Sequence, residues 1–276
     1  MPWFPEFTNA VALARVQTRA DGLADPVGSY LAALNDGDSR DLEDVWAGEI
    51  VIHDPRVGEV RGHQRLQEFV SHNRTWMADH RVRTDIVAAT SADGRAVVEL
   101  LAHVRVDGQD VAWPVAVVAE SPHERSVVFR TYCSQWPVDG RRHVRPPILE
   151  PGNVKPGDIV GRYHAALDAG DAAAIVSTFA LDGYVREPIG RDSVHRGATD
   201  LRAYFDRCFS VGGGIDLEPC VVTDDGVRCV VEYDCVRWGR HGLPPQAGLG
   251  VYERGPDGLL AAVRIYDDIV APVEQA

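Results

Sequence analysis

Apolar residues follow helical spacing at the start of each half of the chain and strand spacing afterwards. Residues 32–34 are apolar and end at a Gly-Asp stop, and Leu42, Val45 and Trp46 follow at helical spacing, which predicts two short helices. Residues 66–76 predict a third helix. Later runs such as RCVVEYDCV and LAAVRIYDDIV have strand length and follow Asp-Asp-Gly and Pro-Asp-Gly turns, so we expect hairpins there. Helices followed by antiparallel strands indicate an α+β fold.

This order of elements occurs twice along the chain, with an offset of 133 residues. YLAALNDGD in the first half corresponds to YHAALDAGD in the second. Four pairs of segments match in the same order. Residues 30–38 match 163–171 and residues 54–55 match 187–188 at this offset; with one or two residues inserted in the second copy, 61–69 match 196–204 and 130–134 match 264–268. Because unrelated features keep one order, the sequence indicates a tandem duplication of one small fold.

A stretch rich in proline, glycine and charge separates the two copies. It reads PVDGRRHVRPPILEPGNVKPGD, a composition that resists both helix and sheet. We therefore predict four parts: an N-terminal extension over 1–24, a first domain over 25–140, a linker over 141–157 and a second domain over 158–276.

Composition narrows the possible functions. The 276 residues are 45% hydrophobic and carry a net charge of −13, which disfavours binding to nucleic acid or to anionic membranes. No apolar run approaches the length of about 20 residues that spans a bilayer, and the first residues lack a signal-peptide pattern, so cytoplasmic residence is expected. The five cysteines contain no CxxC pair. We expect buried thiols, with no metal and no cofactor.

The repeated segments resemble a known family. YLAALNDGD with VIHDPRVG, and VREPIG with VRIYDD, are similar to SnoaL-like polyketide cyclases and ketosteroid isomerases of the nuclear-transport-factor-two-like superfamily. The resemblance covers both copies almost entirely. It implies two cone-shaped, cystatin-like modules, each with a curved, mostly antiparallel sheet wrapped around N-terminal helices and an apolar pocket. Since this fold hosts isomerases, cyclases, epoxide hydrolases, dehydratases and binding modules, it does not imply one reaction.

The resemblance also implies candidate catalytic residues. It maps the family's tyrosine onto Tyr30 and Tyr163, and its carboxylate base onto Asp54 and Glu187. A carboxylate facing an apolar pocket loses hydration, which suits it to take a proton from a weak acid. The family's second oxyanion-hole carboxylate would fall in 114–117 or 248–251, where only apolar residues and glycines stand. Steroid isomerisation by that pair is therefore not expected.

Alternation along the last strand predicts another carboxylate in the second pocket. Val263 and Ile265 are apolar, and Asp267 continues the same face, because side chains two residues apart share one side of a strand. The same rule turns Tyr233 inward and its two neighbours, Glu232 and Asp234, away. Four residues are thus expected around one pocket: Tyr163, Glu187, Tyr233 and Asp267.

The first copy lacks part of this set. Cys133 takes the place of Asp267, and Leu100 takes that of Tyr233. Only Tyr30 and Asp54 remain, so we expect the second domain to be the active one. Trp113 and Trp238 are expected to line the pockets and contact substrate.

Each candidate also has a structural interpretation. Asp-Pro and Glu-Pro commonly open turns, so Asp54 and Glu187 fit a structural role as well. Both helical tyrosines fit a core role. Asp267 and Asp268 also fit two solvated carboxylates.

Three functions remain open from the sequence. One is a cofactor-independent acid/base enzyme, of isomerase, cyclase or epoxide-hydrolase type, acting on a hydrophobic small molecule. The others are a non-catalytic binding protein for an apolar ligand and a protein-interaction module. Pairing of the two domains within the chain is expected, with a homodimer as a further possibility.

Overall fold

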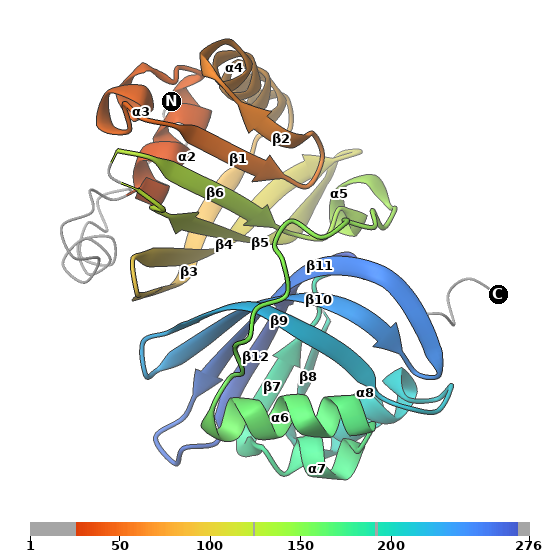
Figure 1. The fold of residues 1–276 in the computed structure, drawn as a ribbon. Helices are drawn as coiled ribbons and strands as arrows, with labels where there is room; N and C mark the ends of the chain where they lie inside the picture. Colours follow the sequence, from red (N-terminus) through yellow and green to blue (C-terminus); the bar gives the residue numbers. More distant parts are fainter. Residues whose placement is uncertain (1–25, 124, 191–192, 270–276) are drawn as a thin grey trace. The chain divides into compact units, whose positions relative to one another are not determined.

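The computed structural model describes residues 26–123, 125–190 and 193–269 (Figure 1). It divides into two compact units, Met1–Cys133 and Ser134–Ala276. Each unit contains one six-stranded sheet with helices, so the predicted α+β class with two tandem cone-shaped modules is confirmed. The predicted N-terminal extension lies outside the described residues.

The first unit combines three described helices with the first sheet. The helices are α2 (Pro26–Asp36), α3 (Arg40–Val45) and α4 (His63–Asp79). The strands are β1 (Ile50–Asp54), β2 (Gly58–Arg61), β3 (Arg83–Ala92), β4 (Arg95–Val106), β5 (Gln109–Glu120) and β6 (Val127–Tyr132). Their order in the sheet is β2-β1-β6-β5-β4-β3, with β1 and β6 parallel and the other neighbours antiparallel.

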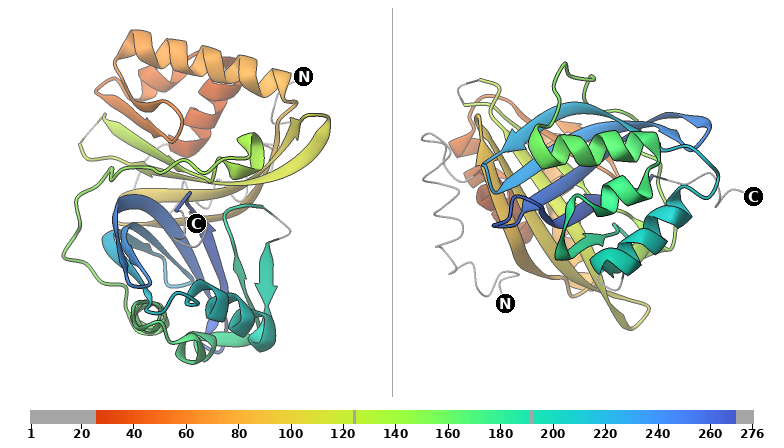
Figure 2. Two further views of the ribbon diagram at one scale, coloured as in Figure 1. Left: turned by 90° about the vertical axis from the view of Figure 1, so that its right-hand side faces the viewer. Right: turned by 90° about the horizontal axis from the view of Figure 1, so that it is seen from below.

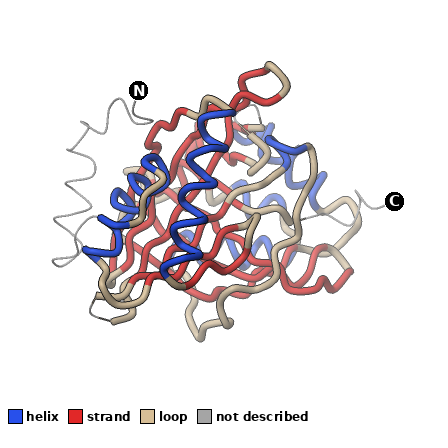
Figure 3. The backbone as a smooth tube through the Cα atoms, turned by 90° about the horizontal axis from the view of Figure 1, so that it is seen from above, coloured by secondary structure: helices blue, strands red, loops and turns tan. Residues whose placement is uncertain are grey.

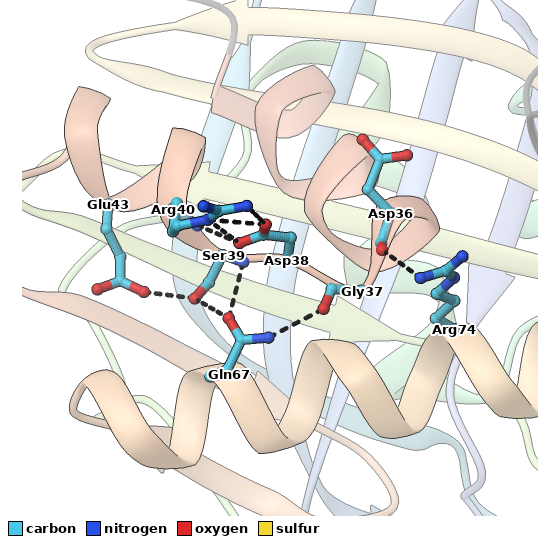
Figure 4. Close-up of polar contacts among 8 residues, drawn as sticks. All are labelled: Asp36, Gly37, Asp38, Ser39, Arg40, Glu43, Gln67 and Arg74. Carbon is cyan, nitrogen blue, oxygen red and sulfur yellow. Dashed lines mark hydrogen bonds and ion pairs between the residues drawn. The ribbon is translucent and has the colours of Figure 1, made fainter.

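Helices α2 and α4 lie side by side over the first sheet (Figure 3). Helix α2 ends at Gly37, whose φ of 67° suits the left-handed turn that closes a helix. Gln67 of α4 fastens this turn (Figure 4): its Oε1 accepts hydrogen bonds from the Ser39 amide and hydroxyl, at 3.2 and 2.9 Å, and its Nε2 donates to the Gly37 carbonyl at 2.9 Å. Arg74 donates to the Asp36 carbonyl at 3.0 Å, so α4 holds the helical layer in place.

The second unit repeats this arrangement. Its helices are α5 (Trp136–Asp139), α6 (Asp158–Ala169), α7 (Ala172–Val176) and α8 (Gly197–Cys208). Its strands are β7 (Phe179–Arg186), β8 (Val194–Arg196), β9 (Ile215–Asp224), β10 (Arg228–Trp238), β11 (His241–Arg254) and β12 (Leu260–Tyr266), in the order β8-β7-β12-β11-β10-β9. Helices α6, α7 and α8 lie over this sheet when it is seen from below (Figure 2).

The segment between the two sheets packs on the second unit before α6 begins. Arg142 donates to the Ile269 carbonyl at 3.0 Å, and the Arg145 carbonyl accepts from the Ala247 amide at 2.9 Å. Further along, the Gly152 amide donates to the Pro219 carbonyl at 3.0 Å. Residues 141–157, expected to form a linker, are thus bonded along the second sheet.

Strand register preserves the sequence repeat. Leu100 lies opposite Val115 in the first sheet, and Tyr233 lies opposite Gly248 in the second. The same offset of 133 residues therefore relates the two central hairpins. Val231, Tyr233 and Cys235 belong to the apolar core, as alternation predicted, while Glu232 and Asp234 lie on the other face of the strand.

Candidate functional site

A cavity of about 420 Å³ lies within the second unit. Small-molecule sites typically have volumes of about 300–1,000 Å³ and mainly apolar walls. The four residues that the sequence grouped around one pocket all line this cavity: Tyr163, Glu187, Tyr233 and Asp267. Other aromatic side chains, Tyr204, Phe205, Trp238 and Tyr252, complete much of its wall.

Asp267 is a buried carboxylate with two hydrogen-bond donors. It directly follows β12, and only 8% of the residue is exposed. The Tyr233 hydroxyl donates to Oδ2 at 2.6 Å, and the Ile269 amide donates to Oδ1 at 3.3 Å. Burial raises the pKa of Asp267 from 3.8 to about 6, although both hydrogen bonds oppose the rise. The interpretation of Asp267 as a solvated carboxylate is therefore wrong.

Its neighbour Asp268 is buried as well, but its carboxylate binds the segment around α5. Oδ1 accepts from the Ser134 hydroxyl at 2.5 Å, and Oδ2 accepts from the amides of Gln135 and His143, both at 2.8 Å. Asp268 thus anchors the segment around α5 to the end of β12. The two adjacent carboxylates, just beyond β12, thus have different partners: Asp267 is bonded to Tyr233 and Asp268 to the segment around α5.

Glu187 lies at the end of β7 and contacts a histidine from the next strand. Its Oε1 is 2.6 Å from Nε2 of His195, and Arg207 of α8 lies 3.9 Å from the same oxygen. The imidazole stacks on the Tyr204 ring, with centroids 4.3 Å apart. Glu187 therefore does more than open a turn, since its carboxylate contacts His195 and Arg207 beside the cavity.

Tyr163 and Trp238 form part of the aromatic wall. The Tyr163 ring meets Phe179, Phe205 and Tyr252 edge-on, with centroids 5.4–6.1 Å apart. Burial raises the pKa of Tyr163, so its hydroxyl keeps its proton at neutral pH. The Trp238 indole N–H donates to the Cys208 carbonyl at 2.9 Å, which satisfies its polar edge and leaves the ring as apolar wall.

The first unit has a cavity of only about 90 Å³. Tyr30, Asp54, Trp113 and Cys133 line it, so three predicted site residues of this half also meet. Tyr30 stacks on Phe129 at 4.5 Å between centroids. Burial raises the pKa of Tyr30, and the nearby charge of Asp54 adds to the rise.

Asp54 is held as a turn residue. Its Oδ1 accepts from the amides of Arg56 and Val57, at 2.8 and 3.1 Å, and Arg56 Nε lies 3.8 Å away. The Arg56 guanidinium lies 4.8 Å over the Trp76 ring and donates to Asn73 at 2.7 Å. These contacts match the structural interpretation of an Asp-Pro turn.

A family model described as the SnoaL-like domain matches the chain twice, over residues 27–140 and 160–263. The chain belongs to the SnoaL-like family. No curated protein matches it.

Several solved structures are similar to one SnoaL-like domain each. A proposed polyketide cyclase from Sinorhizobium meliloti shares 24% identity over 40% of this chain and 94% of that one, with a TM-score of 0.34. The epoxide hydrolase/cyclase-like enzyme SalBIII, which has a role in pyran ring formation in the polyether salinomycin, shares 23% over 39% of this chain and 86% of that one (TM-score 0.34). A protein with a ketosteroid isomerase-like fold from Catenulispora acidiphila shares 16% identity over 44% of this chain and 93% of that one, with a TM-score of 0.36.

Two glycines shape the cavity of the second SnoaL-like domain. A Cβ atom on Gly248 would lie 2.5 Å from the Tyr233 ring, and one on Gly250 would lie 2.8 Å from the Tyr252 hydroxyl. Real Cβ atoms do not approach so closely, so both tyrosine positions depend on the absence of a side chain. The first SnoaL-like domain has valines, Val115 and Val117, at these places.

Sequence reasoning missed the role of His195 at this site. The sequence offers no motif that brings this histidine near Glu187. The described part of the chain holds no group of three or more His, Cys, Asp or Glu side chains placed to bind a metal ion. The pairing of β7 with β8 sets Val185 opposite His195, and this register brings the imidazole near Glu187.

None of the described helices has the length and apolar character needed to cross a membrane. All five cysteines are free thiols. Cys208 alone among them lines the second cavity, and burial raises its pKa to about 11, so it stays protonated at neutral pH.

Proposed function

We propose that the second SnoaL-like domain is a cofactor-independent acid/base enzyme that acts on a hydrophobic small molecule, by isomerase, cyclase or epoxide-hydrolase chemistry. One observation carries this proposal. Asp267, buried and bonded to the Tyr233 hydroxyl at 2.6 Å, lines the same cavity as Glu187.

Acid/base catalysis needs one group that gives a proton and another that takes one. A pKa of about 6 lets Asp267 exchange a proton near neutral pH, while Tyr233 holds its orientation. Glu187 contacts His195 at 2.6 Å and lies 3.9 Å from Arg207, and in this proposal it is the carboxylate that accepts a proton. Two carboxylates in such different surroundings suit opposite roles in one reaction.

Tyr163 is proposed to bind an oxygen atom of the substrate. Its phenol remains protonated, so it can donate a hydrogen bond to an oxygen on which negative charge develops. Such a bond stabilises the transition state more strongly where water is excluded. Opening of an epoxide, ring closure onto a carbonyl, and enol formation all develop charge on oxygen in this way.

The walls of the cavity support an apolar substrate. Tyr204, Phe205, Trp238 and Tyr252 surround the polar groups, and a volume of about 420 Å³ accepts a molecule of small-drug size. In contrast, the first domain offers about 90 Å³, and its carboxylate is bonded to its own turn. We propose that the first domain does not turn over substrate and that the two domains pair within the chain.

The test is product formation from a panel of hydrophobic epoxides and enones. Glu187→Ala and Asp267→Asn should each lower turnover by about 100-fold or more while circular dichroism and thermal melting show a folded protein. Cys133→Ser, the matching change in the first domain, should leave turnover unchanged. Retained turnover in both second-domain variants would reject the assignment of the site.

A non-catalytic binding protein for an apolar ligand is the competing function. It is favoured by the aromatic and aliphatic residues that make up most of the cavity wall. A ligand that copurifies and is released unchanged, together with no product from the whole panel, would support this second function.

A further inference from the structure

One contact beside the proposed site has no counterpart in the first domain. His195 of β8 reaches Oε1 of Glu187 with its Nε2 atom at 2.6 Å. Glu187 lines the cavity, whereas His195 is not among its lining residues and is 21% exposed on its side chain. The imidazole thus contacts the carboxylate without itself lining the cavity.

The imidazole is fixed in this orientation from two directions. Pairing of β8 with β7 sets His195 opposite Val185, which is fully buried, so both face the inside of the cone. The ring stacks on Tyr204 of α8 at 4.3 Å with an interplanar angle of 17°. Because strand and helix both constrain it, little rotational freedom remains to be lost on hydrogen bonding.

We propose that His195 is a positioning residue for Glu187. By donating its Nε2 proton to Oε1, it fixes the plane of the carboxylate and leaves Oε2 for the substrate. This inference rests on the proposed function, since it gives Glu187 a defined geometry for that reaction. Catalytic groups require such support, because a misplacement of about 1 Å can cost about 100-fold in rate.

Among the described residues, helix α8 brings three charged or titratable groups near this pair: Tyr204, Arg207 and Cys208. Arg207 lies 3.9 Å from Glu187, and its guanidinium is 5.5 Å from the Tyr204 ring centre. Burial raises the pKa of Cys208 to about 11 and also raises that of Tyr204, so neither changes charge at neutral pH. Arg207 is 64% exposed on its side chain, so solvent weakens its attraction for Glu187 and the imidazole is the closer support.

The first domain provides the contrast. Its β1–β2 pairing sets Val60 opposite Ile52, where β8–β7 pairing sets His195 opposite Val185. Valine donates no hydrogen bond, and Asp54 is held by the amides of its own turn instead. The histidine therefore occurs only beside the cavity that has room for a ligand.

The experiment combines a spectroscopic test with a kinetic one. In the full chain, the hydrogen-bonded imidazole N–H should give a far-downfield proton resonance that disappears in both His195→Val and Glu187→Ala. With a substrate found in the panel, His195→Val should lower kcat about 10- to 100-fold with KM changed less than about threefold.

The conservative variant and the first-domain control complete the design. His195→Gln keeps an N–H donor of similar reach and should recover part of kcat, whereas Val60→Ala should leave kcat unchanged. If the downfield resonance is missing in the wild-type protein, or if His195→Val matches the wild type in kcat, the positioning role is overturned. A wild-type protein without turnover on any substrate overturns the proposed function itself, and the catalytic role of His195 falls with it.

Discussion

The two domains share one scaffold but enclose cavities of about 90 and 420 Å³. Their helices, strand order and central register correspond. The differences lie in the side chains that point inward, at five matching positions: Leu100 and Tyr233, Val115 and Gly248, Val117 and Gly250, Phe129 and Val263, and Cys133 and Asp267.

These exchanges explain why one cavity is small and the other is large. Phe129 stacks on Tyr30 and fills the first domain, whereas the smaller Val263 stands at its place in the second. On the neighbouring strand, two valines give way to glycines, and Tyr233 and Tyr252 use part of the freed space. Tyr233 can therefore reach Asp267. Small residues on one strand thus leave room for the tyrosine that is hydrogen-bonded to the acid at the end of the next strand.

The largest expected effect is the loss of the buried acid. Asp267→Asn should lower turnover by about 100- to 10,000-fold, the usual contribution of a general acid or base. The measurement is kcat on whichever substrate the panel provides, with Cys133→Ser as control. Equal rates for wild type and Asp267→Asn would show that the two domains do not differ in catalysis at this position.

The same residue should make stability depend on pH. The pKa of Asp267 rises from 3.8 to about 6 on folding, so the folded state binds its proton more tightly than the unfolded state does. The free energy of unfolding should therefore fall as pH rises from about 4 to 6. At about 1.4 kcal/mol per pH unit, the loss reaches about 3 kcal/mol.

Asp267→Asn should remove this pH dependence and be more stable than the wild type at pH 8. Urea denaturation at pH 4, 6 and 8 measures it, and Cys133→Ser should retain the wild-type slope. Parallel slopes for Asp267→Asn and wild type would contradict a buried, ionised carboxylate in the second domain.

Placing the first domain's valine in the wall of the second cavity should lower the free energy of unfolding. Gly248→Val introduces the first domain's residue, and its Cβ would collide with the Tyr233 ring at 2.5 Å. We expect a loss of about 1–3 kcal/mol in the free energy of unfolding, together with weaker binding of apolar dyes. Gly242→Val is the matched control on the same strand, because a Cβ there meets nothing within 4 Å. Similar losses in both variants would contradict a specific role for Gly248.

The smallest expected effect comes from removing the Tyr233 hydroxyl alone. Tyr233→Phe removes the donor at 2.6 Å that holds down the pKa of Asp267, so this pKa should rise above about 6. The pH–rate profile should shift to higher pH, and the free energy of unfolding should fall by about 1 kcal/mol. An unshifted profile would mean that Asp267 does not titrate during turnover.

The sequence contained most of the fold and part of the site. Repeated segments gave the two modules, and alternation through Val263 and Ile265 correctly turned Asp267 inward beside Tyr233. The size of the two cavities could not be predicted from the sequence, because it depends on how side chains from several strands pack into one volume. The His195 contact escaped as well, since a strand of three residues is too short to show a periodic pattern.

Asp268 has a practical consequence for dividing the protein into halves. A fragment beginning at residue 158 would lack Ser134, Gln135 and the amide of His143, the donors to its carboxylate. Each lost partner of a buried group costs about 1–3 kcal/mol, a large share of the stability of a domain of this size. Such a fragment would also lose Arg142 from the cavity wall. The second domain should therefore be expressed from Ser134 onward. Such a fragment keeps all three donors to Asp268.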